Sequence, residues 1–224
     1  MKLALAGLLP DEISDRLALG APYRGEQVFR WIHRGVDAFS SMTNLSADLR
    51  MRLEAEALVS RSTIQQRLAA PDGSVKLRIG LSDGNAVEAM ALEDGSGRRT
   101  ACISTQAGCA MACAFCRTGL MGLKRNLTEA EIVEQLLHLG RGEGAISNLV
   151  FMGMGEPFRN WEAVTRAIAV LHHPAGRGMS LRRITVSTCG IPEGIRGLAA
   201  EGPDVKLAVS IVSADEEARR SLMP

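Results

Sequence analysis

The sequence predicts an α/β fold: a partial parallel βα barrel of about four strands, preceded by a helical segment and a small antiparallel sheet. Two observations predict it. From residue 98 onward, apolar segments of strand length alternate with amphipathic segments of helix length, which is typical of a parallel sheet with right-handed crossovers. Before that point the apolar period changes to two. We expect an N-terminal helical domain over 1–60, an antiparallel β extension over 61–97 and the barrel core over 98–224.

The composition is that of an ordinary globular protein. Of the 224 residues, 46% are hydrophobic and 23% are charged, and the formal net charge of +1 does not indicate a nucleic-acid binder. No apolar run approaches the ~18 residues of a membrane span, and the opening segment lacks an export signal. We expect a cytoplasmic protein with no membrane partner. Five cysteines, three of them clustered, favour metal-binding thiols over a disulfide framework.

Residues 1–60 predict short helices. Pro10 to Glu12 is a typical helix start, residues 27–33 have an amphipathic pattern, and Ser46 is placed to cap a helix that runs to Leu53. The expected small core of this domain comprises Phe29, Trp31, Ile32, Phe39 and Leu45. His33 is expected to be structural, because no second metal-binding residue stands at a useful spacing.

Residues 61–92 predict three antiparallel strands. The apolar and polar residues alternate over 63–69, 75–79 and 87–92, and turn signals at 71–73 and 82–84 separate the three segments. This pattern indicates a meander that leads into the core.

Strands and helices alternate through the core. The first predicted helix opens with a capping box, Thr128 with Glu131, and Leu127 and Ile132 are placed as a hydrophobic staple. The expected strands are 100–104, 148–152, 183–187 and 205–210, and the expected helices are 128–140, 161–172 and 192–200.

A motif follows each predicted strand. In order, these are the cysteine-rich loop, residues 153–157, residues 187–190 and residues 210–212. Because the carboxyl ends of parallel strands meet at one edge, where βα barrels build their active sites, we expect these motifs to share one site.

The spacing of three cysteines indicates an iron–sulfur cluster. Cys109, Cys113 and Cys116 follow the pattern C-x3-C-x2-C, and small residues between them leave room for the loop to wrap a cubane. A structural zinc site or a ferredoxin-type cluster takes four protein ligands. Three thiolates would leave one iron of a four-iron cluster free, whereas a zinc loop would need completion by Cys102 or Cys189.

This loop resembles that of the radical S-adenosylmethionine (SAM) enzymes. In those enzymes the amino and carboxylate groups of SAM chelate the free iron of a [4Fe–4S] cluster, and an aromatic residue, here Phe115, precedes the last cysteine. The Gly155-Glu156 pair looks like the segment that holds the amino group of SAM. The alternative is an ordinary turn between strand and helix, for which the glycines and Pro157 would suffice.

Longer motifs carry a closer resemblance. They cover residues 23–32, 102–109, 125–132, 151–157 and 182–188. Together they are very similar to the bacterial adenine-C2 methyltransferases of large-subunit ribosomal RNA, a family that also modifies certain transfer RNAs. The similarity runs almost from end to end.

The resemblance implies roles residue by residue. It implies that the cluster ligands are Cys109, Cys113 and Cys116. It implies SAM contacts by Gly155, Glu156, Ser187, Ser210, Ile211 and Val212. Glu88 matches the general base, and Cys102 matches a cysteine that forms a transient disulfide with a methyl-carrying cysteine.

The implied function is radical SAM-dependent methylation of carbon 2 of adenine in large-subunit rRNA and in tRNA, through a methyl-cysteine. Carbon 2 is electron-poor, so a radical route is required. The implied cofactors are a [4Fe–4S] cluster and SAM, and the implied partners are the two RNAs and an electron donor such as flavodoxin. Between residues 98 and 128 there are five basic residues and no acidic one, a positive field that suits RNA or the SAM carboxylate.

The chain departs from the family at its end. Its last residue, Pro224, comes just after the fourth predicted strand, whereas the family has six strands, a further SAM-contacting asparagine and the methyl-carrying cysteine. Cys189 stands where the family has serine, and Val212 where it usually has histidine. We expect a fragment that at most binds cluster and SAM. The alternatives are a carbon-8 adenine methyltransferase or another radical SAM enzyme, a non-catalytic protein that binds RNA or a cluster, and a zinc-stabilised module.

Overall fold

One mixed sheet organises the molecule. The computed structural model describes residues 2–141 and 144–224, and its largest sheet has the strand order β11-β10-β9-β6-β5-β4-β3. The first four strands in that order are parallel and the remaining pairings are antiparallel. The strands are β3 (Thr63–Ala69), β4 (Val75–Gly80), β5 (Ala86–Glu93), β6 (Arg99–Cys102), β9 (Asn148–Phe151), β10 (Ile184–Thr188) and β11 (Lys206–Val209).

The predicted elements of the sheet and the core are confirmed, with ends that differ by a residue or two, whereas the helix expected over 27–33 begins at Pro22 and the one expected to run to Leu53 ends at Glu56. The antiparallel meander is present, but β5 pairs directly with β6, so that the meander and the four parallel strands form one continuous sheet. The boundary expected near residue 97 therefore lies within a single sheet, and the division into three domains stays a prediction.

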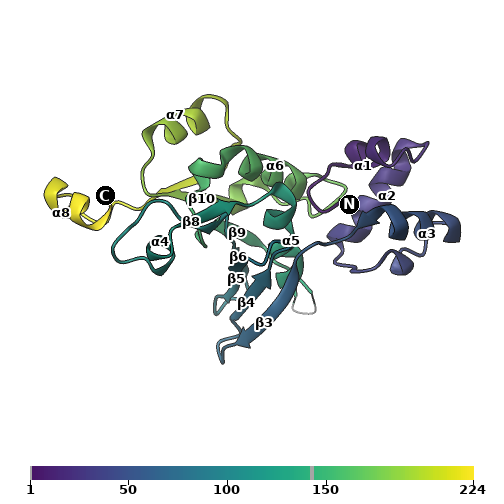
Figure 1. Cartoon of the computed structure of the whole chain (residues 1–224), viewed down its shortest axis with the longest axis horizontal. Coiled ribbons are helices and arrows are strands. Elements are labelled where there is room, and N and C mark those ends of the chain that lie inside the picture. Colours follow the sequence, from purple (N-terminus) through teal and green to yellow (C-terminus); the bar gives the residue numbers. More distant parts are fainter. Residues whose placement is uncertain (1, 142–143) are drawn as a thin grey trace.

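Helices cover one face of the parallel strands. They are α5 (Glu129–Leu139), α6 (Trp161–His172) and α7 (Pro192–Glu201), and they connect successive strands (Figure 1). Ala101, Leu149 and Val186 are fully buried, whereas their neighbours Cys102 and Val150 are half-buried. This alternation places the half-buried side chains on the opposite, less covered face of the sheet.

The capping box predicted for α5 is present. The Thr128 hydroxyl accepts a hydrogen bond from the Glu131 backbone N–H (3.3 Å), and the Glu131 carboxylate accepts one from the Thr128 N–H (3.0 Å). Leu127 and Ile132 are both buried, as the hydrophobic staple requires. The sequence alone therefore fixes where this helix begins.

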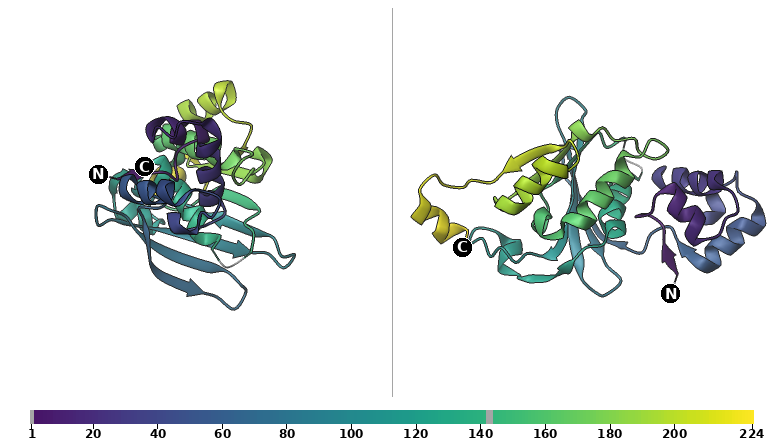
Figure 2. Two further views of the ribbon diagram at one scale, coloured as in Figure 1. Left: turned by 90° about the vertical axis from the view of Figure 1, so that its right-hand side faces the viewer. Right: turned by 90° about the horizontal axis from the view of Figure 1, so that it is seen from above.

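The N-terminal helices form a separate group at one end of the molecule, opposite the short C-terminal helix α8 (Glu216–Leu222) (Figures 1 and 2). They are α1 (Pro10–Arg16), α2 (Pro22–His33), the 3-10 turn η1 (Phe39–Ser41) and α3 (Ala47–Glu56). The short strands β1 (Leu3–Ala4) and β2 (Ala57–Leu58) pair beside them. Ser46 caps α3 as predicted, by accepting a hydrogen bond from the Leu49 N–H (3.3 Å).

The predicted N-terminal core is largely confirmed. Phe29, Ile32, Phe39 and Leu45 are buried, whereas Trp31 is half-buried and donates its indole N–H to Asn44 (2.5 Å). His33 is buried against Phe29, with ring centroids 4.1 Å apart. Its ring nitrogens have no hydrogen-bond partner among the described residues. These contacts agree with a structural role.

A buried carboxylate joins the N-terminal group to the core. Glu134 on α5 is fully buried and accepts hydrogen bonds from the backbone N–H groups of Arg61 (2.9 Å) and Ser62 (2.8 Å). His138, one turn along the helix, lies 3.0 Å from the Ser62 hydroxyl. The segment that leaves the N-terminal helices is therefore fixed to the core by charge-assisted hydrogen bonds. Among the residues described, no helix is both long and apolar enough to cross a membrane.

We predict that Glu134→Ala lowers the free energy of unfolding by roughly 2–4 kcal/mol, because it leaves the buried Ser62 N–H and the partly buried Arg61 N–H without their acceptor. Urea unfolding followed by circular dichroism measures the change. Glu162→Ala, an exposed glutamate in the first turn of α6, is the matched control and should cost well under 1 kcal/mol. An equal loss in the two variants would contradict the prediction.

We also predict that stability falls in mild acid because of two buried histidines. Burial lowers the pKa of His33 to about 3 and that of His138 to about 4, from 6.5 in the unfolded chain. At a pH between the folded and the unfolded pKa of a histidine, the unfolded state binds more protons than the folded state. Each of the two histidines therefore lowers the free energy of unfolding by about 2 kcal/mol as the pH falls from 7 to 5. Unfolding at both pH values measures the loss.

His33→Gln should remove about half of that acid-dependent loss. His172→Gln alters an exposed histidine that contacts the Met179 carbonyl oxygen, and it should leave the loss unchanged. If His33→Gln retains the full loss, burial of this histidine is not its cause.

Candidate functional site

The four predicted motifs meet at the carboxyl ends of the parallel strands. They line a cavity of about 320 Å³ that receives side chains from the cysteine loop, from the loop after β9 and from the ends of β10 and β11. Its lining includes Cys109, Cys113, Cys116, Gly155, Glu156, Ser187, Cys189 and Ser210. The expectation that these motifs share one site is therefore met for eight separate positions.

A hairpin frames the cysteine loop. Strands β7 (Gln106–Gly108) and β8 (Leu123–Asn126) pair on either side of it, and the Cys109 N–H donates to the Gly122 carbonyl oxygen (3.2 Å). Gly108 has a φ of +80°, and a Cβ there would lie 1.9 Å from that same carbonyl oxygen. Only glycine fits this close crossing of the two strands.

The three clustered thiols influence one another. Burial raises the pKa of Cys109, and the neighbouring charges of Cys113 and Cys116 raise it further. The pKa of Cys113 is likewise raised, first by burial and then by Cys116. Three such thiolates are costly side by side unless a cationic centre compensates their charge.

The donor set fits a cluster of several irons. Among the described residues, no three His, Cys, Asp or Glu side chains converge closely enough to hold a single metal ion. Each thiolate of a four-iron cluster binds its own iron, so the three sulfur atoms need not meet at one point. All five cysteines are free thiols.

The loop after β9 presents a buried carboxylate to the same cavity. Glu156 is 4% exposed, and its carboxylate accepts hydrogen bonds from the backbone N–H groups of Cys189 (2.9 Å) and Phe158 (3.2 Å). Gly155 has a φ of +98°, which glycine adopts without strain. A fixed, buried negative charge of this kind is suited to bind a cationic group.

The remaining predicted SAM contacts differ in their placement. Ser187 and Ser210 line the cavity, and the Ser210 N–H continues the ladder by donating to the Thr188 carbonyl oxygen (2.9 Å). Ile211 and Val212 are 60% and 47% exposed and do not line this cavity. Val212 has a φ of +64°, which is unusual for a β-branched residue.

Glu88 and Cys102 lie outside the cavity but on the same face of the sheet. Cys102 pairs with Met90 in the β5–β6 register, and Glu88 is two residues from Met90, so all three side chains share this face. Glu88 forms an ion pair with Lys76 (2.8 Å), and burial raises the pKa of the Cys102 thiol. The structure therefore does not bring these two residues into contact with the cysteine loop.

Sequence reasoning placed Cys189 in the third motif but missed its contact with Glu156, and it missed helix α8. The Cys189 thiol interacts with Glu156, and burial together with that carboxylate raises the pKa of Cys189 to about 12. Arg219 donates to the Cys189 carbonyl oxygen (2.7 Å), and the Ala114 N–H donates to the Leu222 carbonyl oxygen (2.9 Å). Helix α8 therefore packs against the cysteine loop, a contact that no local pattern signals.

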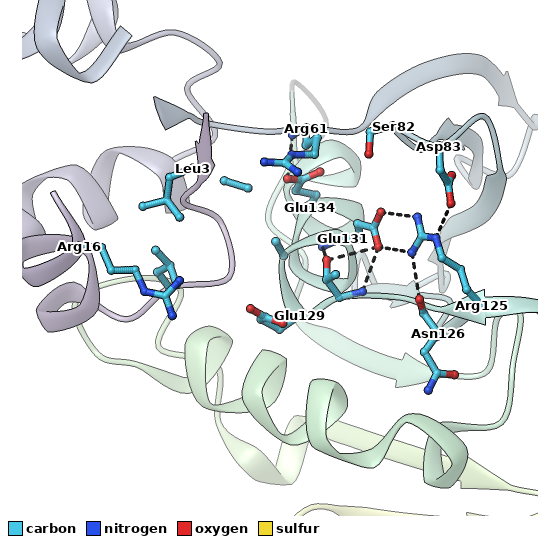
Figure 3. Close-up of a pocket in the computed structure, with 14 residues that line it drawn as sticks. Leu3, Arg16, Arg61, Ser82, Asp83, Arg125, Asn126, Glu129, Glu131 and Glu134 are labelled. Carbon is cyan, nitrogen blue, oxygen red and sulfur yellow. Dashed lines mark hydrogen bonds and ion pairs between the residues drawn. The ribbon is translucent and has the colours of Figure 1, made fainter. Parts of the chain in front are cut away.

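A larger cavity, of about 510 Å³, lies between the N-terminal segment and α5 (Figure 3). Arg125 makes two hydrogen bonds of 2.7 Å to Glu131 there and also binds Asp83, whose pKa is held below its usual range mainly by this contact. The charges of Arg125, Glu131 and Asp83 therefore compensate one another within this cavity. The smaller cavity, where thiols and a carboxylate converge, is the candidate functional site.

Comparisons with known proteins agree with this choice. Residues 103–224 match the model of the radical SAM superfamily, and residues 18–59 match that of the ribosomal RNA large subunit methyltransferase N-terminal domain. The superfamily uses a [4Fe–4S] cluster and SAM.

The chain is similar over its whole length to named relatives. A probable dual-specificity RNA methyltransferase RlmN of Treponema denticola is 52% identical over 223 residues, which cover 100% of this chain and 64% of the relative. The protein of the same name from Treponema pallidum (strain Nichols) is 50% identical over 99% of this chain and 65% of its own length. The chain thus spans somewhat less than two thirds of these relatives.

A solved structure extends the similarity to the fold. The crystal structure of a radical SAM methyltransferase from Sphaerobacter thermophilus superposes with a TM-score of 0.94 at 38% sequence identity, covering 99% of this chain and 67% of that protein. Since the family model covers more than half of the chain and its motifs line one cavity, the chain belongs to the radical SAM superfamily.

Proposed function

We propose that this chain holds the cluster-binding and SAM-binding part of an enzyme that methylates carbon 2 of adenine in large-subunit ribosomal RNA and in transfer RNA. The observation that supports this most is the single cavity shared by the three clustered cysteines, Glu156 and Ser187. RNA of these two kinds would be modified in the cytoplasm. An electron donor such as flavodoxin would supply the reducing electron.

The cysteine loop would hold the cluster. Cys109, Cys113 and Cys116 would each bind one iron, and the β7–β8 hairpin fixes the two ends of the loop. When bound, the cluster and SAM supply the radical chemistry that an electron-poor ring carbon requires. Phe115, 59% exposed at the tip of the loop, would cover the cluster from solvent on that side.

The loop after β9 would hold the aminoacyl end of SAM. Glu156 keeps lone pairs free beyond its two backbone donors, and it would accept hydrogen bonds from the SAM ammonium group. Ser187 and Ser210 carry hydroxyls on the same rim and would bind polar groups of the nucleoside part. Gly155 lets the backbone approach the ligand closely, and Ile211 and Val212 would contact it only at its outer edge.

Glu88 and Cys102 would act on the RNA side of the reaction. Glu88 would take the proton from carbon 2, and its ion pair with Lys76 (2.8 Å) would hold the carboxylate in place on this face of the sheet. Cys102 corresponds to the disulfide-forming cysteine of the family. Its half-buried position on the same sheet face as Glu88 supports a role there.

We predict that anaerobic reconstitution with iron and sulfide loads about four irons per chain. Cys113→Ala should lose most of this iron and all cleavage of SAM to 5′-deoxyadenosine under a strong reductant, because one iron loses its only protein ligand. Metal and sulfide analysis and chromatography of the nucleoside give the two measurements. Cys102→Ser, which removes a thiol outside the cysteine spacing, is the control and should keep its iron. Bound zinc without iron would overturn the cluster assignment.

We predict that joining this chain to the C-terminal third of the Treponema denticola relative yields an enzyme that methylates an rRNA fragment at carbon 2 of adenine. Mass spectrometry of nuclease digests distinguishes this product from one methylated at carbon 8. The same hybrid with Glu88→Gln should lose methylation while it still cleaves SAM. A folded, cluster-loaded hybrid that leaves carbon 2 unmethylated would refute the proposed function.

A further inference from the structure

One buried amide side chain connects the two halves of the site. Gln106 lies three residues before Cys109, on β7, and is 1% exposed. Its Oε1 accepts a hydrogen bond from the Glu156 backbone N–H (2.9 Å), and its Nε2 donates to Asn126 Oδ1 on β8 (2.7 Å). Both ends of the amide are therefore occupied, one by the loop that carries Glu156 and one by the hairpin that carries the cysteines.

The backbone around Gln106 also contacts the loop that carries Glu156. The N–H groups of Thr105 and Gln106 donate to the Met154 carbonyl oxygen, at 2.8 and 3.2 Å. A Cβ on Gly155 would lie 2.5 Å from the Gln106 Cβ, so Gly155 rests directly on this side chain. The segment that precedes Cys109 and the segment that carries Glu156 thus touch over several residues, with Gln106 between them.

Glu156 is fixed from three sides as a result. Gln106 holds its backbone N–H, and the N–H groups of Phe158 and Cys189 hold its carboxylate. Without Gln106, the carboxylate would keep its own donors, but the backbone that carries it would lose the hydrogen bond from its N–H to the cysteine hairpin. A shift of about 1 Å at such a site is enough to weaken ligand binding substantially.

We propose that Gln106 is a positioning residue that sets the distance between Glu156 and the cluster cysteines and thereby determines the affinity for the aminoacyl group of SAM. This inference rests on the proposed function, since it takes SAM as the ligand of Glu156. Gln106 itself does not line the cavity, so it acts through Glu156 and not by touching the ligand.

The test measures SAM binding by equilibrium dialysis to the reconstituted, unreduced chain, so that no turnover is needed. We expect Gln106→Ala to weaken SAM binding at least tenfold while the iron content stays at the wild-type level. Asn126→Ala, at an exposed position that should tolerate the change, should weaken it severalfold because Gln106 loses its orienting acceptor. In a Glu156→Gln background, Gln106→Ala should have little further effect.

Gln135→Ala is the matched control. Gln135 is also a buried amide, and it bonds the backbone of Ser104 on the same segment (2.8 and 2.9 Å) without contacting Glu156. Iron-loaded Gln106→Ala and Asn126→Ala variants that bind SAM within twofold of wild type would overturn the inference. A loss of SAM binding in Gln135→Ala as large as in Gln106→Ala, or a parallel loss of iron, would also overturn it. If the wild-type chain loads iron but binds no SAM, the proposed function fails, whatever Gln106 does.

Discussion

The site depends on the pairing between β6 and β9 and on its continuation beyond the ends of both strands. The ladder does not stop at Cys102, because the Ile103 N–H donates to the Val150 carbonyl oxygen and the Gly153 N–H donates to that of Ile103. Parallel pairing of this kind carries two chain segments past the sheet in fixed register. The cysteine loop and the Glu156 loop leave the sheet from this common base, and their relative position follows from it.

Hydrogen bonds from backbone N–H groups to a buried carboxylate stabilise two different parts of the molecule. Glu134 and Glu156 are both buried carboxylates, and each accepts hydrogen bonds from two backbone N–H groups. Backbone donors are strong and need no ordering of a flexible side chain. At Glu134 this arrangement fixes the chain that leaves the N-terminal helices, and at Glu156 it fixes a charge beside the cluster loop. Helix α5, which carries Glu134, packs against α6, β4 and β5, and the sheet that contains β4 and β5 also contains β9, from which the Glu156 loop leaves.

The order of strands and helices could be predicted from the sequence, because the apolar period and the capping box at Thr128 are local signals. The direct pairing of β5 with β6 could not be predicted, since the period of apolar residues does not show which edge strands of two sheets will pair. The β7–β8 hairpin was missed because three residues at Gln106–Gly108 carry no strand pattern. Cys109, Cys113, Cys116 and Glu156 were found from motifs, whereas the contacts of Gln106 and Cys189 depend on residues 50 and 33 positions away.

Glu88 and Cys102 lie outside the cavity, but the sheet connects them to it. Cys102 pairs with Val150 across β6 and β9, and Met152, two residues further on, lines the cavity. A continuous row of side chains on one sheet face therefore leads from Glu88 through Cys102 to the cavity wall. The sheet thus places the proposed proton acceptor and the cluster-binding cavity on one face, joined by this row of side chains.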